Sequence, residues 1–145
     1  MSIIIEKFTL KVFNKKNVVG TIGHFIDVTD KINTIVACSS IKKGLANISV
    51  SAATASLITV ENEPGIAIDL PRLLDTIVPV NRVYQHDNMW HEGNAFAHLK
   101  SALLGTNITV PIVSGEIELT NWQRIVLIDF DNKPRIRQIV VGISF

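Results

Sequence analysis

The chain has 145 residues, of which 47% are hydrophobic and 19% are charged, and its formal net charge is +1. This length fits one globular domain over residues 1–145 with a sizeable core, since domains most often have ~100–150 residues. The near-zero charge excludes a global field that would recruit nucleic acid or an anionic membrane. We therefore expect neither partner, and any anion site must be local.

The first residues, MSIIIEKFTL, lack the basic and apolar regions of a signal peptide, and no run approaches the ~20 apolar residues of a membrane span. We therefore expect a cytoplasmic protein. The lone cysteine, Cys38, lies in an apolar run without a disulfide partner, which predicts a buried, unreactive thiol. A mean hydropathy of +0.31 predicts a homo-oligomer, because a monomer of this size would expose part of its apolar surface.

The first third of the chain predicts two strands and a helix. Apolar and polar residues alternate over 3–13, which is the period of a half-buried strand, and NKKN at 14–17 then turns the chain. A short strand over 23–28 follows. Thr29 is a candidate N-cap for a helix whose apolar residues recur at helical spacing and which ends where two lysines precede Gly44.

The middle of the chain predicts two more strands, a helix and a long loop. LANISVSA and ASLITVEN are rich in strand-forming residues and are joined by ATAS. A helix over 66–78 is interrupted at Pro71, which lacks a backbone donor, and Asp69 is a candidate cap for the restarted helix. Residues 79–93 show no clear period, and a loop of that length in a compact domain is more often functional than idle.

The last third predicts a helix over 94–104 that closes on Gly105, and then three strands over 106–113, 117–130 and 135–143. The helix has an apolar face and a polar stripe, formed respectively by Ala95, Phe96, Leu99, Ala102, Leu103 and by Asn94, His98, Ser101. IVLI in the second strand is apolar on both faces, as in a central strand. These elements predict an α+β fold, a large mixed, mostly antiparallel sheet with helices packed on one face.

Three of the four histidines follow the spacing His86-x4-His91-x6-His98. Two or three imidazoles could ligate zinc or another divalent ion such as magnesium, with Asp87 or Glu92 as oxygen ligands or as partners that orient a ring. The alternative is that these histidines are solvated or hydrogen-bonded without metal. A shared site requires convergence, so we expect His86 and His98 to lie within ~10 Å of each other in one cleft.

Arg135 and Arg137 are two residues apart on a predicted strand and therefore point to the same face. Two guanidinium groups in this arrangement could bind a phosphate or a carboxylate. A solvated strand edge is the alternative interpretation.

Several motifs together resemble the YjbQ-like family, often labelled secondary thiamine-phosphate synthase. They are ATASLITVENEPGIAIDL, YQHD, NAFAHLKSALLGTNITVPI, SGEIEL followed by WQRIVLIDFD, and PRIRQIVV, in the family's order over almost the whole chain. The resemblance implies a single α+β domain with a large mixed sheet. It also implies that the chains form homo-oligomers, specifically trimers, and that histidines from three motifs surround a cleft. His86 and His98 match the second and third of these. Other matching positions are Glu61, Asn62, Asp69, Trp122, Gln123, Arg135 and Arg137.

The sequence departs from the family pattern at two places. Ala52 stands where the family usually has its first histidine, and Thr120-Asn121 precede Trp122-Gln123 where the family has Gly-Thr. An alanine can neither ligate a metal nor move a proton. Either His91 supplies a third imidazole, or the site works with two. Restoring the imidazole at position 52 should strengthen zinc binding, unless Ala52 packs in the core.

The resemblance implies a transferase that joins a pyrimidine pyrophosphate to a thiazole phosphate. His86 and His98 would hold a divalent metal or act as acid and base, Asp87 would orient a ring, and Arg135 with Arg137 would bind phosphate. Further substrate contacts would come from Glu61, Asn62, Trp122 and Gln123. One alternative is a non-catalytic binding or structural oligomer that lost its chemistry with Ala52. Another is a metal-dependent hydrolase of a small phosphorylated metabolite.

Overall fold

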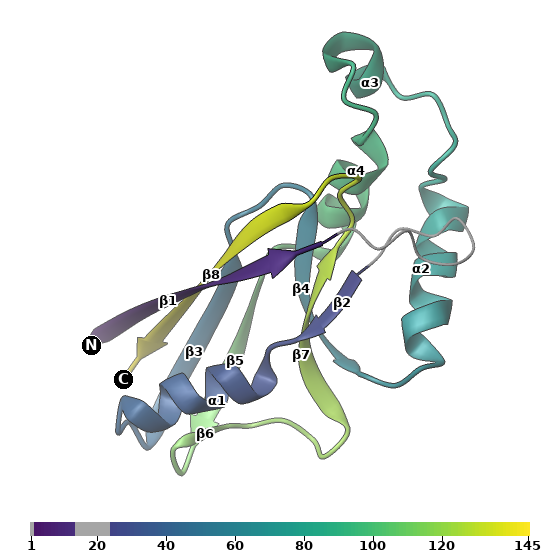
Figure 1. The fold of residues 1–145 in the computed structure, drawn as a ribbon. Helices are drawn as coiled ribbons and strands as arrows, with labels where there is room; N and C mark the ends of the chain where they lie inside the picture. Colours follow the sequence, from purple (N-terminus) through teal and green to yellow (C-terminus); the bar gives the residue numbers. More distant parts are fainter. Residues whose placement is uncertain (1, 14–23) are drawn as a thin grey trace.

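The structure is a computed structural model that describes residues 2–13 and 24–145 (Figure 1). These residues form, in chain order, β1 (Ile3–Val12), β2 (His24–Asp27), α1 (Thr29–Cys38), β3 (Lys43–Val50), β4 (Ala55–Glu61), α2 (Ile66–Ile77), α3 (Gln85–Trp90), α4 (Ala95–Leu104), β5 (Asn107–Val113), β6 (Glu116–Ile117), β7 (Gln123–Asp129) and β8 (Arg135–Ser144). The turn predicted at 14–17 and the start of the strand predicted over 23–28 lie outside the described residues.

The strands form two hydrogen-bonded sheets, and the predicted α+β class is confirmed. A five-stranded sheet has the order β1-β8-β3-β5-β6, and a three-stranded sheet has the order β2-β7-β4. Every strand pair among the described residues is antiparallel. The β1–β8 pair runs from Ile3 opposite Ser144 to Val12 opposite Arg135, so the two ends of the chain lie side by side (Figure 1).

Two apolar clusters form the core, one on each face of the three-stranded sheet. The first packs the inner face of the five-stranded sheet against α1 and one face of the three-stranded sheet, and the second packs the other face of that sheet against α2 and α4. Strand β7 contributes to both, with Ile125 and Leu127 in the first cluster and Val126 and Ile128 in the second. The prediction of a central strand with two buried faces is therefore confirmed.

Helix α1 ends earlier than predicted. It stops at Cys38, and the lysine before Gly44 already begins β3. Gly44 is needed inside the sheet, because a Cβ atom there would lie 2.3 Å from the carbonyl oxygen of Ser144. Cys38 is exposed in the last turn of the helix, so the prediction of a buried thiol was wrong.

Helix α2 continues through Pro71 without the predicted interruption. Pro71 has no backbone N–H, so the helix lacks one hydrogen bond there. Apolar contacts offset this loss, because Pro71 is buried and Leu74 belongs to the second cluster. Asp69 lies in the first turn and caps no second helix. The side chain of Glu63 instead accepts hydrogen bonds from the backbone N–H groups of Gly65 and Ile66 at the start of the helix.

The region predicted as a loop over 79–93 contains the six-residue helix α3. Figure 1 shows α3 next to the end of α4 and away from both sheets. His86 is therefore a helical residue, whereas His91 is the C-cap of α3, with a left-handed φ of 56°.

The buried face of α4 differs from the predicted one. Phe96 and Lys100 are buried together with Ser101, whereas Leu99 and Leu103 are 43% and 56% exposed. The polar side chains find partners inside, since Lys100 pairs with Asp75 of α2 and the Ser101 hydroxyl donates to a backbone carbonyl of β4 at 2.7 Å. With these polar groups inside, three of the predicted apolar residues, Leu99, Ala102 and Leu103, are exposed.

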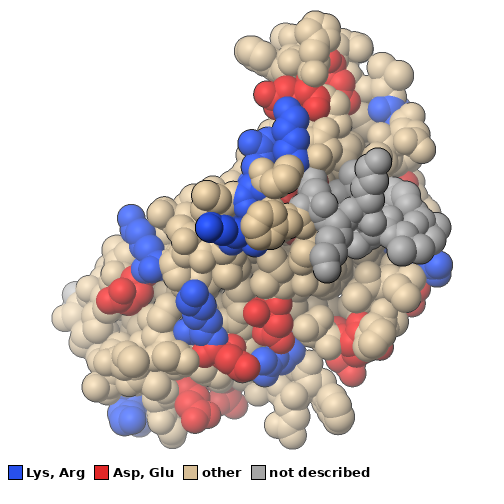
Figure 2. All heavy atoms as spheres, viewed as in Figure 1, with Lys and Arg blue, Asp and Glu red and all other residues tan. Residues whose placement is uncertain are grey.

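Basic and acidic side chains are interspersed over the face shown in Figure 2, in keeping with the small net charge. None of the helices in residues 2–13 and 24–145 combines the length and the apolar character needed to cross a membrane.

Candidate functional site

His86 on α3 and His98 on α4 converge, as the sequence predicted. Their ring centroids are 4.6 Å apart and their planes are tilted by 52°. Asp87 holds the two helices in this arrangement, because its Oδ1 atom accepts a hydrogen bond of 3.0 Å from the backbone N–H of Ala95, the first residue of α4. The contact found for Asp87 is thus with a helix terminus, where a carboxylate is favourable, and not with an imidazole ring.

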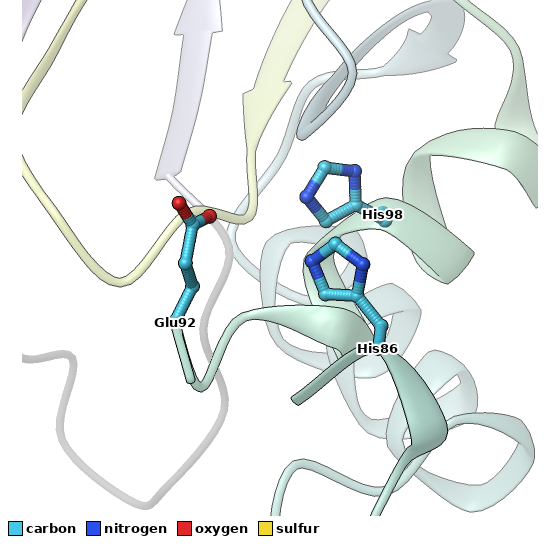
Figure 3. Close-up of side chains that lie close together, drawn as sticks. All are labelled: His86, Glu92 and His98. Atoms are coloured by element: carbon cyan, nitrogen blue, oxygen red, sulfur yellow. The ribbon is translucent and has the colours of Figure 1, made fainter. Parts of the chain in front are cut away.

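Glu92 is the third member of the cluster. One ligand atom from each of His86, Glu92 and His98 lies within 4.8 Å of the other two. Figure 3 shows the Glu92 carboxylate facing the two imidazoles. Asn132 fixes the segment that carries Glu92, because its Nδ2 atom donates to the carbonyls of Glu92 and Gly93 at 3.1 and 3.0 Å.

His91 lies outside this cluster, although the sequence made it a candidate metal ligand. Its left-handed backbone and that of Gly93, with φ of 63°, reverse the chain between α3 and α4. The exposed His91 is therefore at the turn itself, and the neighbouring carboxylate is the one that meets the histidine pair.

The surroundings of His98 favour its neutral imidazole. Burial lowers the pKa of His98, and the nearby His86 lowers it further, while Asp131 and Glu92 act in the opposite direction. Neutral imidazole is the form that binds metal. The Nε2 atom of His86 is buried and has no hydrogen-bond partner among the described residues, which is a costly state for a polar atom without a ligand.

A buried network of charges lies beside His98. Arg137 makes two hydrogen bonds to the carboxylate of Asp129, at 2.5 and 2.9 Å, and Arg135 binds Asp131 through Nε at 2.8 Å. Burial opposes ionisation of Asp131, yet its hydrogen bonds from Arg135 and Thr54 lower its pKa overall. The Arg137 side chain is only 7% exposed. Arg137 also lies 3.7 Å from the carboxylate of Asp131, so the predicted arginine pair makes three ion pairs with two buried aspartates.

The other positions that match the family lie elsewhere. Glu61 pairs with Gln123 at one end of the β4–β7 ladder, whereas Ala55 pairs with Asp129 at the other end. Six residues of strand separate these ends by about 20 Å. Asn62 donates to Asp27 at 3.4 Å, and Trp122 is 75% exposed.

Asp69 and Ala52 also lie outside the histidine cluster. Asp69 is exposed on α2, 4.0 Å from Arg72, and is not part of the histidine cluster. Ala52 is partly buried against the first apolar cluster. Its methyl group thus packs where the resemblance would put an imidazole.

Sequence reasoning missed the acidic half of the charge network. Asp129 and Asp131 are 2% and 0% exposed, and the second of them is also bound by the Thr54 hydroxyl at 2.8 Å. A signal was present, because DFD and RIR place two acids and two bases at equal spacing on the two sides of one turn. In the structure β7 and β8 belong to different sheets, so these ion pairs form between the two sheets, next to the turn that joins the strands.

Sequence and fold comparisons identify relatives over most of the chain. The profile of the family described as UPF0047 protein YjbQ-like matches residues 15–144. A UPF0047 protein of Archaeoglobus fulgidus is 36% identical over 116 residues, which is 80% of this chain and 87% of the relative. YugU, a UPF0047 protein of Bacillus subtilis, is 32% identical over 114 residues, 77% of this chain and 83% of the relative.

Solved structures agree with this result. A YbjQ-like protein from Sulfolobus solfataricus superposes with a TM-score of 0.86 at 26% identity, covering 98% of this chain and 96% of the other. A protein of the YjbQ/UPF0047 family from Clostridium acetobutylicum has a TM-score of 0.83 at 30% identity and covers 96% and 99% of the two chains. The chain thus belongs to the UPF0047, or YjbQ-like, family.

Proposed function

We propose that His86, Glu92 and His98 bind a divalent metal ion, zinc in the first instance, and that the protein is a metal-dependent enzyme acting on a small phosphorylated metabolite. The observation that carries this proposal is the clustering of their three ligand atoms within 4.8 Å. Two imidazoles and one carboxylate form a donor set that catalytic zinc sites use, with a position left for water or substrate.

A divalent ion in this site would polarise a phosphoryl oxygen or lower the pKa of a bound water. The side chains have separate tasks. His86 and His98 present imidazole nitrogens, and Glu92 presents a carboxylate. Asp87 and Asn132 keep α3 and the Glu92 segment in place through the hydrogen bonds described above.

For the reaction we propose the coupling of a pyrimidine pyrophosphate to a thiazole phosphate, which the family resemblance implies. A divalent cation suits this chemistry because it neutralises the charge that develops on the leaving pyrophosphate. Arg135 is the guanidinium that we expect to contact phosphate. Its side chain is 39% exposed and makes one described hydrogen bond, whereas the Arg137 side chain is buried and doubly bound by Asp129.

Zinc titration by calorimetry tests the metal site. We expect one zinc ion per chain in the wild type, and a loss of affinity of at least about tenfold in His98→Ala and Glu92→Gln. His91→Asn is the matched control, because asparagine tolerates the left-handed backbone and His91 lies outside the cluster. A wild type that binds no zinc, or a control that loses as much affinity as Glu92→Gln, would contradict the proposed site.

Product analysis with the two thiamine precursors tests the reaction. Formation of the coupled phosphate ester with release of pyrophosphate supports the transferase. Release of inorganic phosphate from either precursor alone would support the hydrolase instead. A zinc-loaded protein that produces neither would leave the binding or structural oligomer as the better explanation.

A further inference from the structure

A recess of about 420 Å³ lies between α3 and α4, directly against the two histidines. Its lining consists of Tyr84, Gln85, His86, Ala95, His98 and Leu99. None of these is a carboxylate, a lysine or an arginine. The volume falls within the range of ~300–1,000 Å³ that is usual for small-molecule sites.

The recess is built to present apolar surface. The hydroxyl of Tyr84 donates to the carbonyl of Pro79 at 2.8 Å, so its polar end already has a partner. Ala95 is a small residue at the first position of α4, and the hydrogen bond from its N–H to Asp87 fixes its distance from α3. Leu99 follows one turn later and is 43% exposed, although sequence periodicity placed it in the core.

The two histidines belong to both the charged cluster and the recess. They lie close to Glu92, and Asp131 and Arg135 also act electrostatically on His98. The recess is lined by the same two histidines but by none of these charged residues. A ligand that contacts both the cluster and the recess must therefore carry a charged or metal-binding group and, next to it, an uncharged, apolar group.

We infer that the recess binds a small uncharged ring of the ligand whose polar group reaches the site formed by His86, Glu92 and His98. This inference rests on the proposed metal site for its polar end and names the ligand class for the other end. Contact between an apolar ring and the recess removes apolar surface from water on both partners and needs no compensating charge.

Two hydroxamates that differ only in the apolar group test the inference on the zinc-loaded protein. Benzohydroxamate carries a phenyl ring next to its metal-binding group, and acetohydroxamate carries a methyl group. We expect benzohydroxamate to bind about tenfold more tightly, because the ring buries more apolar area. Leu99→Trp should fill the recess and abolish this difference.

Leu103→Trp is the matched control. Leu103 lies one turn further along α4, is 56% exposed and does not line the recess. It should keep the preference for benzohydroxamate. Equal affinities for the two hydroxamates in the wild type, or equal losses in the two tryptophan variants, would overturn the inference and leave zinc binding, and with it the proposed function, intact.

A metal-free experiment keeps the inference testable if zinc does not bind. Benzamide, an uncharged ring, should shift the backbone amide resonances of Gln85 and Ala95 in the wild type and in Leu103→Trp, but not in Leu99→Trp. No shift in the wild type would overturn the inference. Sedimentation distinguishes one rival occupant: if Leu99→Trp converts an oligomer into a monomer and benzamide causes no shift, an apolar side chain of a second copy fills the recess.

Discussion

The buried ion pair between Asp75 of α2 and Lys100 of α4 allows a sharp test of what stabilises the packing of these two helices. Lys100 is 0% exposed, its Nζ atom contacts the carboxylate of Asp75, and the Phe96 ring centroid lies 5.7 Å from the same Nζ. Asp75→Ala removes the countercharge and leaves an ammonium group inside the protein. Because removal of one partner of a buried pair typically costs about 3–5 kcal/mol, we expect a loss in that range in the free energy of unfolding.

Lys100→Met is the contrasting change. Methionine keeps much of the length and apolar stem of lysine but has no charge. The Lys100–Asp75 ion pair is therefore lost, but no unpaired cation is left in the interior. The Asp75 side chain is 23% exposed and can be hydrated in part. Replacement of a buried ion pair by apolar residues is often neutral or stabilising. We therefore expect Lys100→Met to cost less than Asp75→Ala, and the double variant to recover most of the loss.

Urea unfolding followed by circular dichroism measures these differences. Asp69→Ala is the control on the same helix, because Asp69 and Arg72 are 75% and 64% exposed and exposed pairs contribute little. The reasoning fails if Asp75→Ala is no more destabilising than this control, or if Lys100→Met is the more damaging of the two single changes.

Three further predictions concern the site and the assembly. The His98 imidazole of the metal-free protein should titrate below its ordinary pKa of 6.5, chiefly because of burial. As the pH falls below 6.5, His98 is protonated in the unfolded chain before it is protonated in the folded protein, so the stability of the folded protein decreases. An NMR titration midpoint at or above 6.5 contradicts this prediction. Ala52→His should lower the melting temperature, by overpacking worth about 1–3 kcal/mol, and leave zinc affinity unchanged; tighter zinc binding would favour the three-histidine site instead. Sedimentation should show a homo-oligomer, since Ile3, Ile5 and Ile136 leave apolar surface on β1 and β8, and the family resemblance implies a trimer; a monomer at micromolar concentration contradicts it.

Sequence patterns predicted most of the strands because a strand's pattern is local, but the strand predicted over 117–130 was wrong in extent, since the structure has the short β6 and then β7 with residues 118–122 between them. The alternation over 3–13 and the doubly apolar IVLI correspond to β1 and β7 in the structure. The orientation of α4 was not predictable in the same way. Its buried lysine depends on a partner 25 positions earlier, on another helix, and periodicity treats any lysine as a surface residue.

The site shows the same contrast between local and non-local information. The spacing of His86 and His98 was enough to expect convergence once one turn joined their segments. The choice between His91 and Glu92 depends on the turn after α3, where His91 and Gly93 are left-handed and Glu92 lies near the histidine pair. Residue spacing does not encode that backbone angle, because histidine enters the left-handed region only occasionally.

The charges around the histidines also predict an order of binding. Arg137 is matched by Asp129 and Arg135 by Asp131, and no salt bridge to Glu92 is present among residues 2–13 and 24–145. Among these residues, the carboxylate charge that has no cationic partner at the metal-free site is therefore that of Glu92.

The Glu92 carboxylate would repel a phosphate group. Arg135 already donates from Nε to Asp131, so only part of its guanidinium group is available to bind phosphate. A divalent ion reverses the sign of the site, so phosphate should bind after the metal and not before it. Inorganic phosphate titrated into metal-free protein should give no measurable binding, and prior loading with zinc should create it. Glu92→Gln removes the repelling charge and should allow weak phosphate binding without zinc. Phosphate binding of equal strength in the metal-free and zinc-loaded wild type would show that the arginines act as a phosphate site on their own, despite their internal partners.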